Sequence, residues 1–140
     1  MIDQQTGHLT LAPSVCICAG DSLETVAALV VGESTEVRDL HNGWKWLSTH
    51  NVPVGPNYVH FHFCFCQNCL QMISVGISPE RTALLGSWEN WSERAERERL
   101  GALKHWVREE LGREGRFSWG TVTADYDEKS ASSGITITYN

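Results

Sequence analysis

Histidine and cysteine alternate along a short segment near the middle of the chain, where they could ligate a metal ion or supply a reactive thiol. The segment runs from His60 to Cys69 and reads HFHFCFCQNC. Because side chains alternate between the two faces of a β-strand, His60, His62, Cys64 and Cys66 share one face. The phenylalanines between them share the other face. This alternation predicts a strand whose apolar side builds the core.

Zinc is the first chemistry that this face suggests, since His and Cys are its usual ligands and Cys66-x-x-Cys69 has the spacing of half a zinc knuckle. Structural zinc sites combine two such pairs from separate turns, and the sequence around this segment supplies one turn. Alternate residues of a strand lie roughly 6.5–7 Å apart, too far for four ligands in a row to share an ion with bonds of about 2–2.3 Å. We therefore expect no metal and no other cofactor, and keep a small metal- or thiol-dependent protein using this hairpin as the alternative.

A cysteine nucleophile is the second chemistry that these residues could support, with His62 as a base for Cys64. Such a thiol needs a helix N-terminus or a glycine-rich oxyanion turn beside it, and neither adjoins these cysteines in the sequence. A buried free cysteine more commonly packs as a small apolar side chain. The chain also lacks a phosphate-binding glycine loop, a serine elbow and an HExxH motif. The sequence therefore predicts a protein that is not an enzyme.

Length and charge restrict the class of protein further. The chain has 140 residues, which suits a single domain over residues 1–140 with a core of its own, and it carries a net charge of −6. An acidic protein is a poor direct ligand for nucleic acid, because phosphate binding requires a basic surface. Acidic charge attracts basic protein partners. On charge alone, solubility is the simpler explanation.

The cysteines also indicate the compartment. Cys16 pairs with Cys18 in one tight group, and Cys64, Cys66 and Cys69 form the other. Neither group resembles the spaced framework of a secreted disulfide protein. The N-terminus has no basic region followed by an apolar run, and no apolar stretch approaches the ~20 residues of a membrane span. We expect a cytoplasmic protein with reduced thiols and no membrane association.

Apolar periodicity predicts an α+β fold, a mainly antiparallel sheet with two helices. The first helix is short, begins with Asp21 and Glu24 as capping residues and ends before Gly32. The second covers about 91–111, ends at Gly112 and packs on the sheet. Its expected buried stripe is Leu100, Leu103, Val107 and Leu111.

Strands account for most of the remaining chain. A hairpin is expected from residues 58–66 and 69–77, with Cys66 opposite Cys69 and Phe63 opposite Met72. Other expected strands are Val15–Cys18, Trp44–Ser48, a single strand through Phe117, Trp119, Thr121 and Thr123, and a final one through Ile135, Ile137 and Tyr139. Residues 52–57 and 125–134 are expected to be loops.

An acidic cluster, Asp125-Tyr126-Asp127-Glu128, lies in the second of these loops. The spacing and the glycine of a calcium-binding EF-hand are absent from it. Exposed turn residues explain its composition. A tyrosine-bearing acidic loop is also suited to contact a basic partner, because tyrosine supplies contact area at a low entropic cost.

The order of motifs along the last third of the chain resembles that of a group of small bacterial proteins. A W-x-x-W-S-E helix start at 88–93 is followed by a W-G-x-V strand at 119–122 and a Y-D-x-K loop at 126–129. The opening residues, 6–11, are similar to that group's N-terminus. These are immunity proteins of bacterial polymorphic-toxin systems, including contact-dependent growth inhibition. The chain departs from them at Ser130-Ala131-Ser132-Ser133, where glycines are expected, and in its Cys/His-rich hairpin.

The resemblance implies a cytoplasmic protein that binds the C-terminal toxin domain delivered by a sibling cell. Binding would block the active site of the toxin or the access of its substrate. If the toxin is a nuclease with a basic cleft, acidic groups are suited to complement it. The partner-binding candidates are then Glu89, Asp125, Tyr126, Asp127 and Glu128. An intracellular interaction domain unrelated to toxins fits the same residues.

Overall fold

A computed structural model describes residues 2–12, 15–29, 33–54, 57–78, 93–127 and 132–139, which form strands and two helices. The helices are α1 (Leu23–Leu29) and α2 (Glu93–Leu111). The strands are β1 (Leu9–Ala12), β2 (Val15–Ile17), β3 (Glu33–Asp39), β4 (Trp44–Val54), β5 (Asn57–Cys66), β6 (Cys69–Ser78), β7 (Gly115–Phe117), β8 (Gly120–Asp127) and β9 (Ser132–Tyr139).

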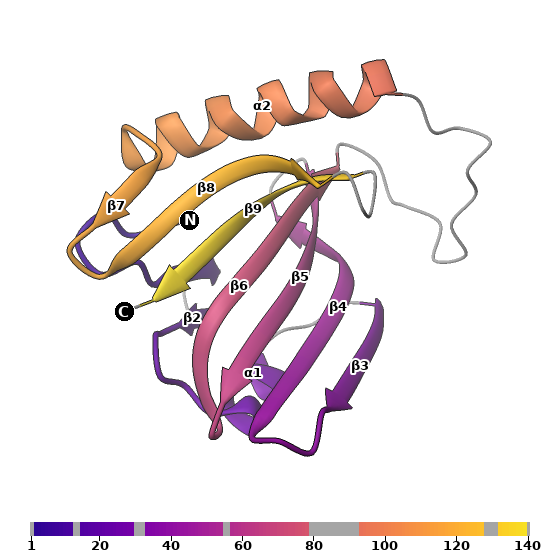
Figure 1. Ribbon diagram of the computed structural model, residues 1–140, viewed down its shortest axis with the longest axis vertical. Helices are drawn as coiled ribbons and strands as arrows, with labels where there is room; N and C mark the ends of the chain where they lie inside the picture. The colour runs from indigo at the N-terminus through magenta and orange to yellow at the C-terminus, as the bar shows by residue number, and fades with distance from the viewer. Residues whose placement is uncertain are drawn as a thin grey trace.

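The larger sheet is antiparallel, and its seven strands follow the order β3-β4-β5-β6-β9-β8-β7. A second sheet consists of β1 and β2. The large sheet is strongly curved, with α2 lying along β8 and β9 and with α1 behind the middle strands (Figure 1). The predicted α+β class, with a short first helix and a long helix on an antiparallel sheet, is confirmed.

The phenylalanine face of β5 lies at the centre of the core, as its alternation predicts. Phe61, Phe63 and Phe65 are fully buried, and the rings of Phe61 and Phe63 stack with their centroids 5.2 Å apart. The first two strands and the first helix, β1, β2 and α1, form an N-terminal layer that contributes Leu9, Ile17 and Val26. The long helix α2 contributes Leu103, Val107 and Leu111. The N-terminal layer and α2 therefore share one core with the sheet.

The β5–β6 hairpin closes through the two-residue turn Gln67-Asn68, as predicted. Both residues have positive φ, 51° and 62°, which is typical of the type I′ turn that matches the twist of the strands. Cys66 lies opposite Cys69, but the predicted pairing of Phe63 with Met72 is wrong. A bulge after Cys64 inserts one extra residue on β6 and places Phe63 opposite Ile73.

The N-terminus of α1 differs from the prediction. Ser22 is the capping residue, since its Oγ accepts the Thr25 N–H at 3.2 Å, whereas the Asp21 carboxylate accepts the N–H of Cys18 at 2.9 Å. Asn68 of the hairpin turn accepts the Leu23 N–H at 3.2 Å and so holds α1 against β5 and β6. The predicted stop at Gly32 lies outside the described residues.

The long helix follows its prediction closely. Gly112 ends it with a φ of 80° and donates its N–H to the carbonyl of Arg108 at 2.8 Å. Three members of the predicted stripe are buried, and Leu100 packs at its edge. The predicted first residues, 91 and 92, lie outside the described ranges. In the part of the chain that the structure describes, no helix has both the length and the apolar character to cross a membrane.

Two predicted loops and one predicted strand are wrong. β4 continues through the predicted 52–57 loop to Val54, with a bulge between Thr49 and Val52 where Asn51 adopts a φ of 53°. The single strand predicted through Phe117 and Thr123 is a hairpin of β7 and β8. The predicted 125–134 loop is mostly ladder, because β8 extends to residue 127 and β9 begins at residue 132. In each case, pairing between consecutive strands supplied the backbone hydrogen bonds that local polarity did not predict.

The N-terminal turn is locked onto the C-terminal strands by contacts around Gly7. The Tyr139 hydroxyl donates to the Gly7 carbonyl at 2.7 Å, and Trp119 Nε1 donates to the Gln4 carbonyl at 3.0 Å. The Trp119 ring stacks on Phe117, with centroids 5.1 Å apart, and lies directly against Gly7. A Cβ at Gly7, whose φ is 73°, would lie 2.2 Å from Trp119 Cε3. Only glycine fits this contact.

We expect Gly7→Ala to destabilise the fold more than Gly20→Ala. Both glycines have positive φ, 73° and 82°, so each substitution carries the left-handed backbone penalty of about 1–2 kcal/mol. A Cβ at Gly20 meets nothing within 4 Å, whereas at Gly7 it meets the Trp119 ring and adds about 1–3 kcal/mol of overpacking. Urea unfolding of both variants measures the difference, and equal free energies of unfolding would contradict the packing argument.

Candidate functional site

The face of the large sheet opposite the core carries an ordered array of polar and aromatic side chains, which we call the open face. Directly paired residues cross the strands from β3 to β8 in rows. One row is Arg38, Trp46, Cys64, Met72, Thr138 and Thr121. The next is Glu36, Ser48, His62, Ser74, Thr136 and Thr123. Both described helices pack on the other side of the sheet, where their apolar residues join the core.

Two adjoining hollows lie on the open face. The larger, which we call the polar hollow, has a volume of about 880 Å³ and a mixed lining that includes the polar side chains of Glu36, Arg38, Ser48 and His62. The smaller has a volume of about 410 Å³ and is largely apolar; it is lined by Leu40, Trp44, Trp46, Cys64, Gln71, Met72 and Thr138. Trp46 and Met72 line both hollows, so the two form one continuous surface. This surface could receive apolar and polar side chains of a partner.

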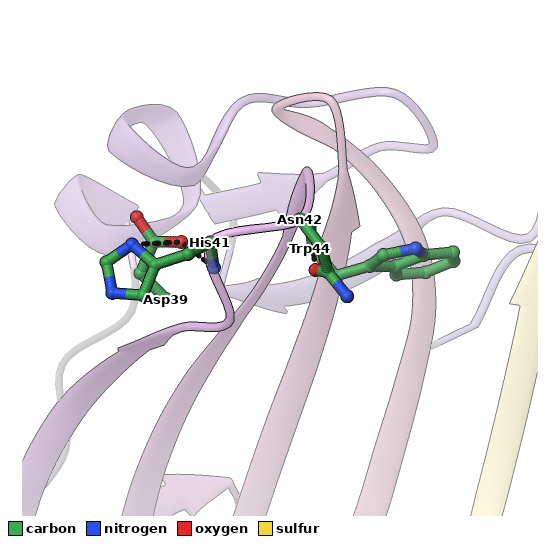
Figure 2. A network of polar contacts seen from close by, with 4 residues as sticks. All are labelled: Asp39, His41, Asn42 and Trp44. Atoms are coloured by element: carbon green, nitrogen blue, oxygen red, sulfur yellow. Dashed lines mark hydrogen bonds and ion pairs between the residues drawn. The ribbon is translucent and has the colours of Figure 1, made fainter.

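The turn between β3 and β4 holds Trp44 at the rim of the apolar hollow. Asp39 Oδ1 accepts the His41 N–H at 2.8 Å, and Asn42 Oδ1 accepts the Trp44 N–H at 3.2 Å (Figure 2). The Trp44 ring points away from the His41 side of the turn in this view. Trp44 is 40% exposed and Leu40 is 38% exposed, and because both line the same hollow they form an exposed apolar patch. A fixed turn therefore presents an aromatic side chain to solvent.

Three histidines gather beside the polar hollow. The His50 ring lies 5.6 Å from the ring of His60 and 5.8 Å from that of His62, between centroids. Ser48 Oγ and His62 Nδ1 are hydrogen-bonded at 2.8 Å. Nδ1 of His60 accepts the N–H of Asn51 at 3.1 Å, so a neutral His60 carries its proton on Nε2. These bonds fix the orientation of both rings.

Burial keeps His60 and His62 in their neutral forms. It is the largest cause that lowers the pKa of both side chains from the ordinary value of 6.5, and the positive charge of a protonated His50 lowers both further. His62 and Arg99 add to the effect on His60. At neutral pH this part of the open face therefore offers uncharged hydrogen-bonding groups.

The chemistry expected of the His60–Cys69 hairpin as the alternative does not assemble. Cys64 is 3% exposed, and burial raises its pKa, which disfavours the reactive thiolate. Within the described ranges, the His, Cys and carboxylate groups close enough to share an ion are His8, Cys16 and Cys18, from the N-terminal hairpin. His8 reaches the two cysteines only through the pairing of β1 with β2, so no local sequence pattern predicts this cluster.

The acidic partner-binding candidates lie partly on the same surface. Asp125 is exposed near the end of β8, on the side of the strand that carries Thr121 and Thr123. The backbones of Tyr126 and Asp127 pair with Ser133 and Ser132 in the ladder, so they belong to a strand and not to a loop. Glu89 and Glu128 lie outside the described residues. A binding role for these five residues stays a prediction.

Sequence reasoning missed the aromatic part of the open face. Trp44, Trp46 and Ser48 alternate with the buried Leu47, and this period of two could have identified an exposed aromatic edge. Tryptophans are common in cores, which makes the signal ambiguous in the sequence. The neighbouring strands that complete the surface are set by tertiary pairing.

Comparison with known proteins finds a shared fold and no family. No protein-family model and no curated protein matches the chain. Among solved structures, the chain matches one from the structure of Rhs1-CT in complex with cognate immunity protein RhsI1, with a TM-score of 0.53 and 14% sequence identity. The match covers 99% of this chain and 86% of that chain. The α+β architecture therefore occurs in a toxin–immunity complex.

We expect acidification to destabilise the protein through His60 and His62. Below the ordinary pKa of 6.5, the unfolded chain binds more protons than the folded one, so the free energy of unfolding falls as the pH falls. Above that value these two groups contribute no slope. Protonation of His60 Nδ1 would also break its bond with the Asn51 N–H.

His60→Asn should flatten this pH dependence, because the Asn side chain can accept the same N–H without titrating. Urea unfolding at about pH 7.5, 6 and 5 measures the slope. His41→Asn is the control, since the His41 side chain is 88% exposed and its positive φ suits asparagine. A His60→Asn protein with the wild-type slope would contradict the assignment.

Proposed function

We propose that this chain is a cytoplasmic immunity protein that binds the C-terminal toxin domain of its cognate toxin through the open face. The observation that carries the proposal is the continuous surface around Trp44, Trp46 and Met72, with Arg38 and Glu36 beside it. The motif order along the last third and a fold that occurs in a toxin–immunity complex support the choice of partner. The protein would act by binding and not by catalysis.

The composition of the open face suits a protein interface. Trp, Met and Arg are enriched at such interfaces, and Trp and Arg carry a large share of the binding energy. The apolar hollow between Trp44 and Met72 offers a pocket for an anchoring side chain. Because these residues lie on a paired sheet and a hydrogen-bonded turn, little conformational entropy is lost when they bind.

Acidic groups surround the aromatic centre. Glu36 lines the polar hollow, Asp39 lies in the β3–β4 turn, and Asp125 lies at the other end of the sheet. With a net charge of −6, the protein would attract a toxin that has a basic surface. A nuclease toxin is the finer hypothesis, since its cleft must hold phosphates. An inhibitor seated over such a cleft would exclude the substrate.

Trp44→Ala is expected to weaken neutralisation by at least about tenfold, because an exposed tryptophan at a pocket rim is typical of an interface hot spot. Under this proposal the cognate toxin is encoded immediately upstream of this gene, and its C-terminal domain is the partner to test. Its affinity is measured by calorimetry with purified proteins, and protection is measured as growth of cells that express the toxin domain. Urea unfolding checks that the variant keeps its stability.

A matched pair of arginines controls for a general loss of charge. Arg38→Ala on β3 should weaken binding, whereas Arg108→Ala on the exposed side of α2 should bind as the wild type does. If the upstream domain binds, but Trp44→Ala and Arg38→Ala bind it normally, the open face is not the interface. If wild-type protein neither binds nor protects, the immunity function itself is wrong.

Asp125→Asn is expected to act on the association rate. A charge at the rim of an interface steers the encounter, so its loss should lower the association rate and reduce its dependence on salt, with the dissociation rate little changed. Stopped-flow binding at low and moderate ionic strength measures both rates. Glu109→Gln on α2 removes the same charge from another surface and is the control. Identical salt dependence in both variants would count against an acidic rim.

A further inference from the structure

The N-terminal hairpin brings His8 together with Cys16 and Cys18, which lie eight and ten residues further along the chain. In the β1–β2 ladder, Leu9 pairs with Ile17 and Thr10 pairs with Cys16. The same antiparallel register places His8 across from Cys18. Leu9 and Ile17 point into the core, so His8, Cys16 and Cys18 lie on the opposite side of the hairpin.

The ligand atoms of these residues are already close enough to share one ion. One nitrogen of His8 and the sulfurs of Cys16 and Cys18 all lie within 4.8 Å of one another. The two sulfurs are 3.8 Å apart. A tetrahedral zinc ion with Zn–S bonds of about 2.3 Å holds two sulfurs ~3.8 Å apart, so the pair needs no rearrangement.

The backbone around the cluster is held in place by contacts that do not involve the ligand atoms. The Asp21 carboxylate accepts the Cys18 N–H at 2.9 Å, and the Tyr139 hydroxyl donates to the carbonyl of Gly7, the residue before His8. The close packing of Gly7 on Trp119 fixes the same turn. Asp21 also brings a negative charge near an incoming cation. The site is therefore preorganised by the fold.

Access and chemistry both favour a soft cation. Cys16 is exposed, and His8 and Cys18 are half-buried, so an ion can enter and a fourth position faces solvent. Thiolate and imidazole ligands suit zinc, whereas magnesium and calcium require oxygen ligands.

We propose that His8, Cys16 and Cys18 form a zinc site, with one imidazole nitrogen, two thiolates and a water molecule as the ligands. On binding, Zn²⁺ replaces the protons of the two thiols, which are released to solvent, and the bound cluster of Zn²⁺ and two thiolates carries no net charge. The site lies on the N-terminal hairpin and not on the open face. It is independent of the proposed toxin binding and stabilises the turn that joins the N-terminus to β8 and β9.

Cobalt titration tests the site, because Co²⁺ adopts the zinc geometry and its visible and near-ultraviolet absorption reports tetrahedral thiolate ligation. Untagged, reduced, metal-free protein should bind one Co²⁺ with these bands, and Zn²⁺ should displace it. Cys16→Ser, Cys18→Ser and His8→Asn should each lower the affinity by more than about 100-fold, because the loss of a ligand costs more than the 10–100-fold typical of an outer-shell group. Cys16 is exposed, so its replacement by serine leaves the core intact.

Cys66→Ser and Cys69→Ser are the matched controls, since both remove a thiol from the other cysteine group and should keep the wild-type cobalt spectrum. Circular dichroism establishes that each variant is folded, and zinc should raise the Tm of the wild type and of the controls but not that of Cys16→Ser. If the thiolate spectrum survives in the double variant that carries both Cys16→Ser and Cys18→Ser, the proposal is overturned. Loss of the spectrum in the hairpin controls, or no tetrahedral spectrum in the wild type, would also overturn it.

Discussion

Burial of the phenylalanine face of β5 is the interaction on which the rest of this structure depends. Phe61, Phe63 and Phe65 are fully buried in the middle of the sheet, and each contributes about 1.5–3 kcal/mol relative to an exposed side chain. Because the side-chain period of a strand is two, a slip of one residue would move all three rings to the other face. The same constraint that builds the core therefore determines which residues form the open face.

Two separate layers cover the core side and leave the open face available. α2 packs on β8 and β9, while α1 and the N-terminal hairpin cover the middle strands (Figure 1). The N-terminal layer is held at both ends, by Asn68 at the start of α1 and by Trp119 and Tyr139 around Gly7. These contacts join residues far apart in the sequence, so the first residues of the chain help to hold the last strand in place.

Much of this fold could be predicted from the sequence where the signal is local. The alternation along β5, the turn at Gln67-Asn68 and the stripe of α2 each depend on neighbouring residues, and each prediction is confirmed. The bulges and the length of the β8–β9 ladder are set by pairing between strands, and the β7–β8 turn interrupts a segment whose apolar alternation continues through it; these predictions were wrong or absent. The candidate functional residues divide in the same way, into those with a local sequence signal and those that strand pairing brings together. The acidic residues were visible as a cluster, whereas the aromatic hollow and the His8–Cys18 pairing exist only once strands are paired.

The distribution of charge over the open face has a physical reason under the proposed binding function. Burying an ion in an interface costs several kcal/mol unless a partner compensates it, whereas a neutral group with satisfied hydrogen bonds costs little. His60 and His62 are kept neutral by burial and are held by Asn51 and Ser48, beside the tryptophans. The exposed carboxylate of Asp125 lies away from this centre, where it stays hydrated and still acts at a distance. Glu36 and Arg38 on the edge strand β3 and Asp125 on β8 flank these neutral histidines, and this arrangement combines a low desolvation cost at the histidines with long-range attraction by the charged groups.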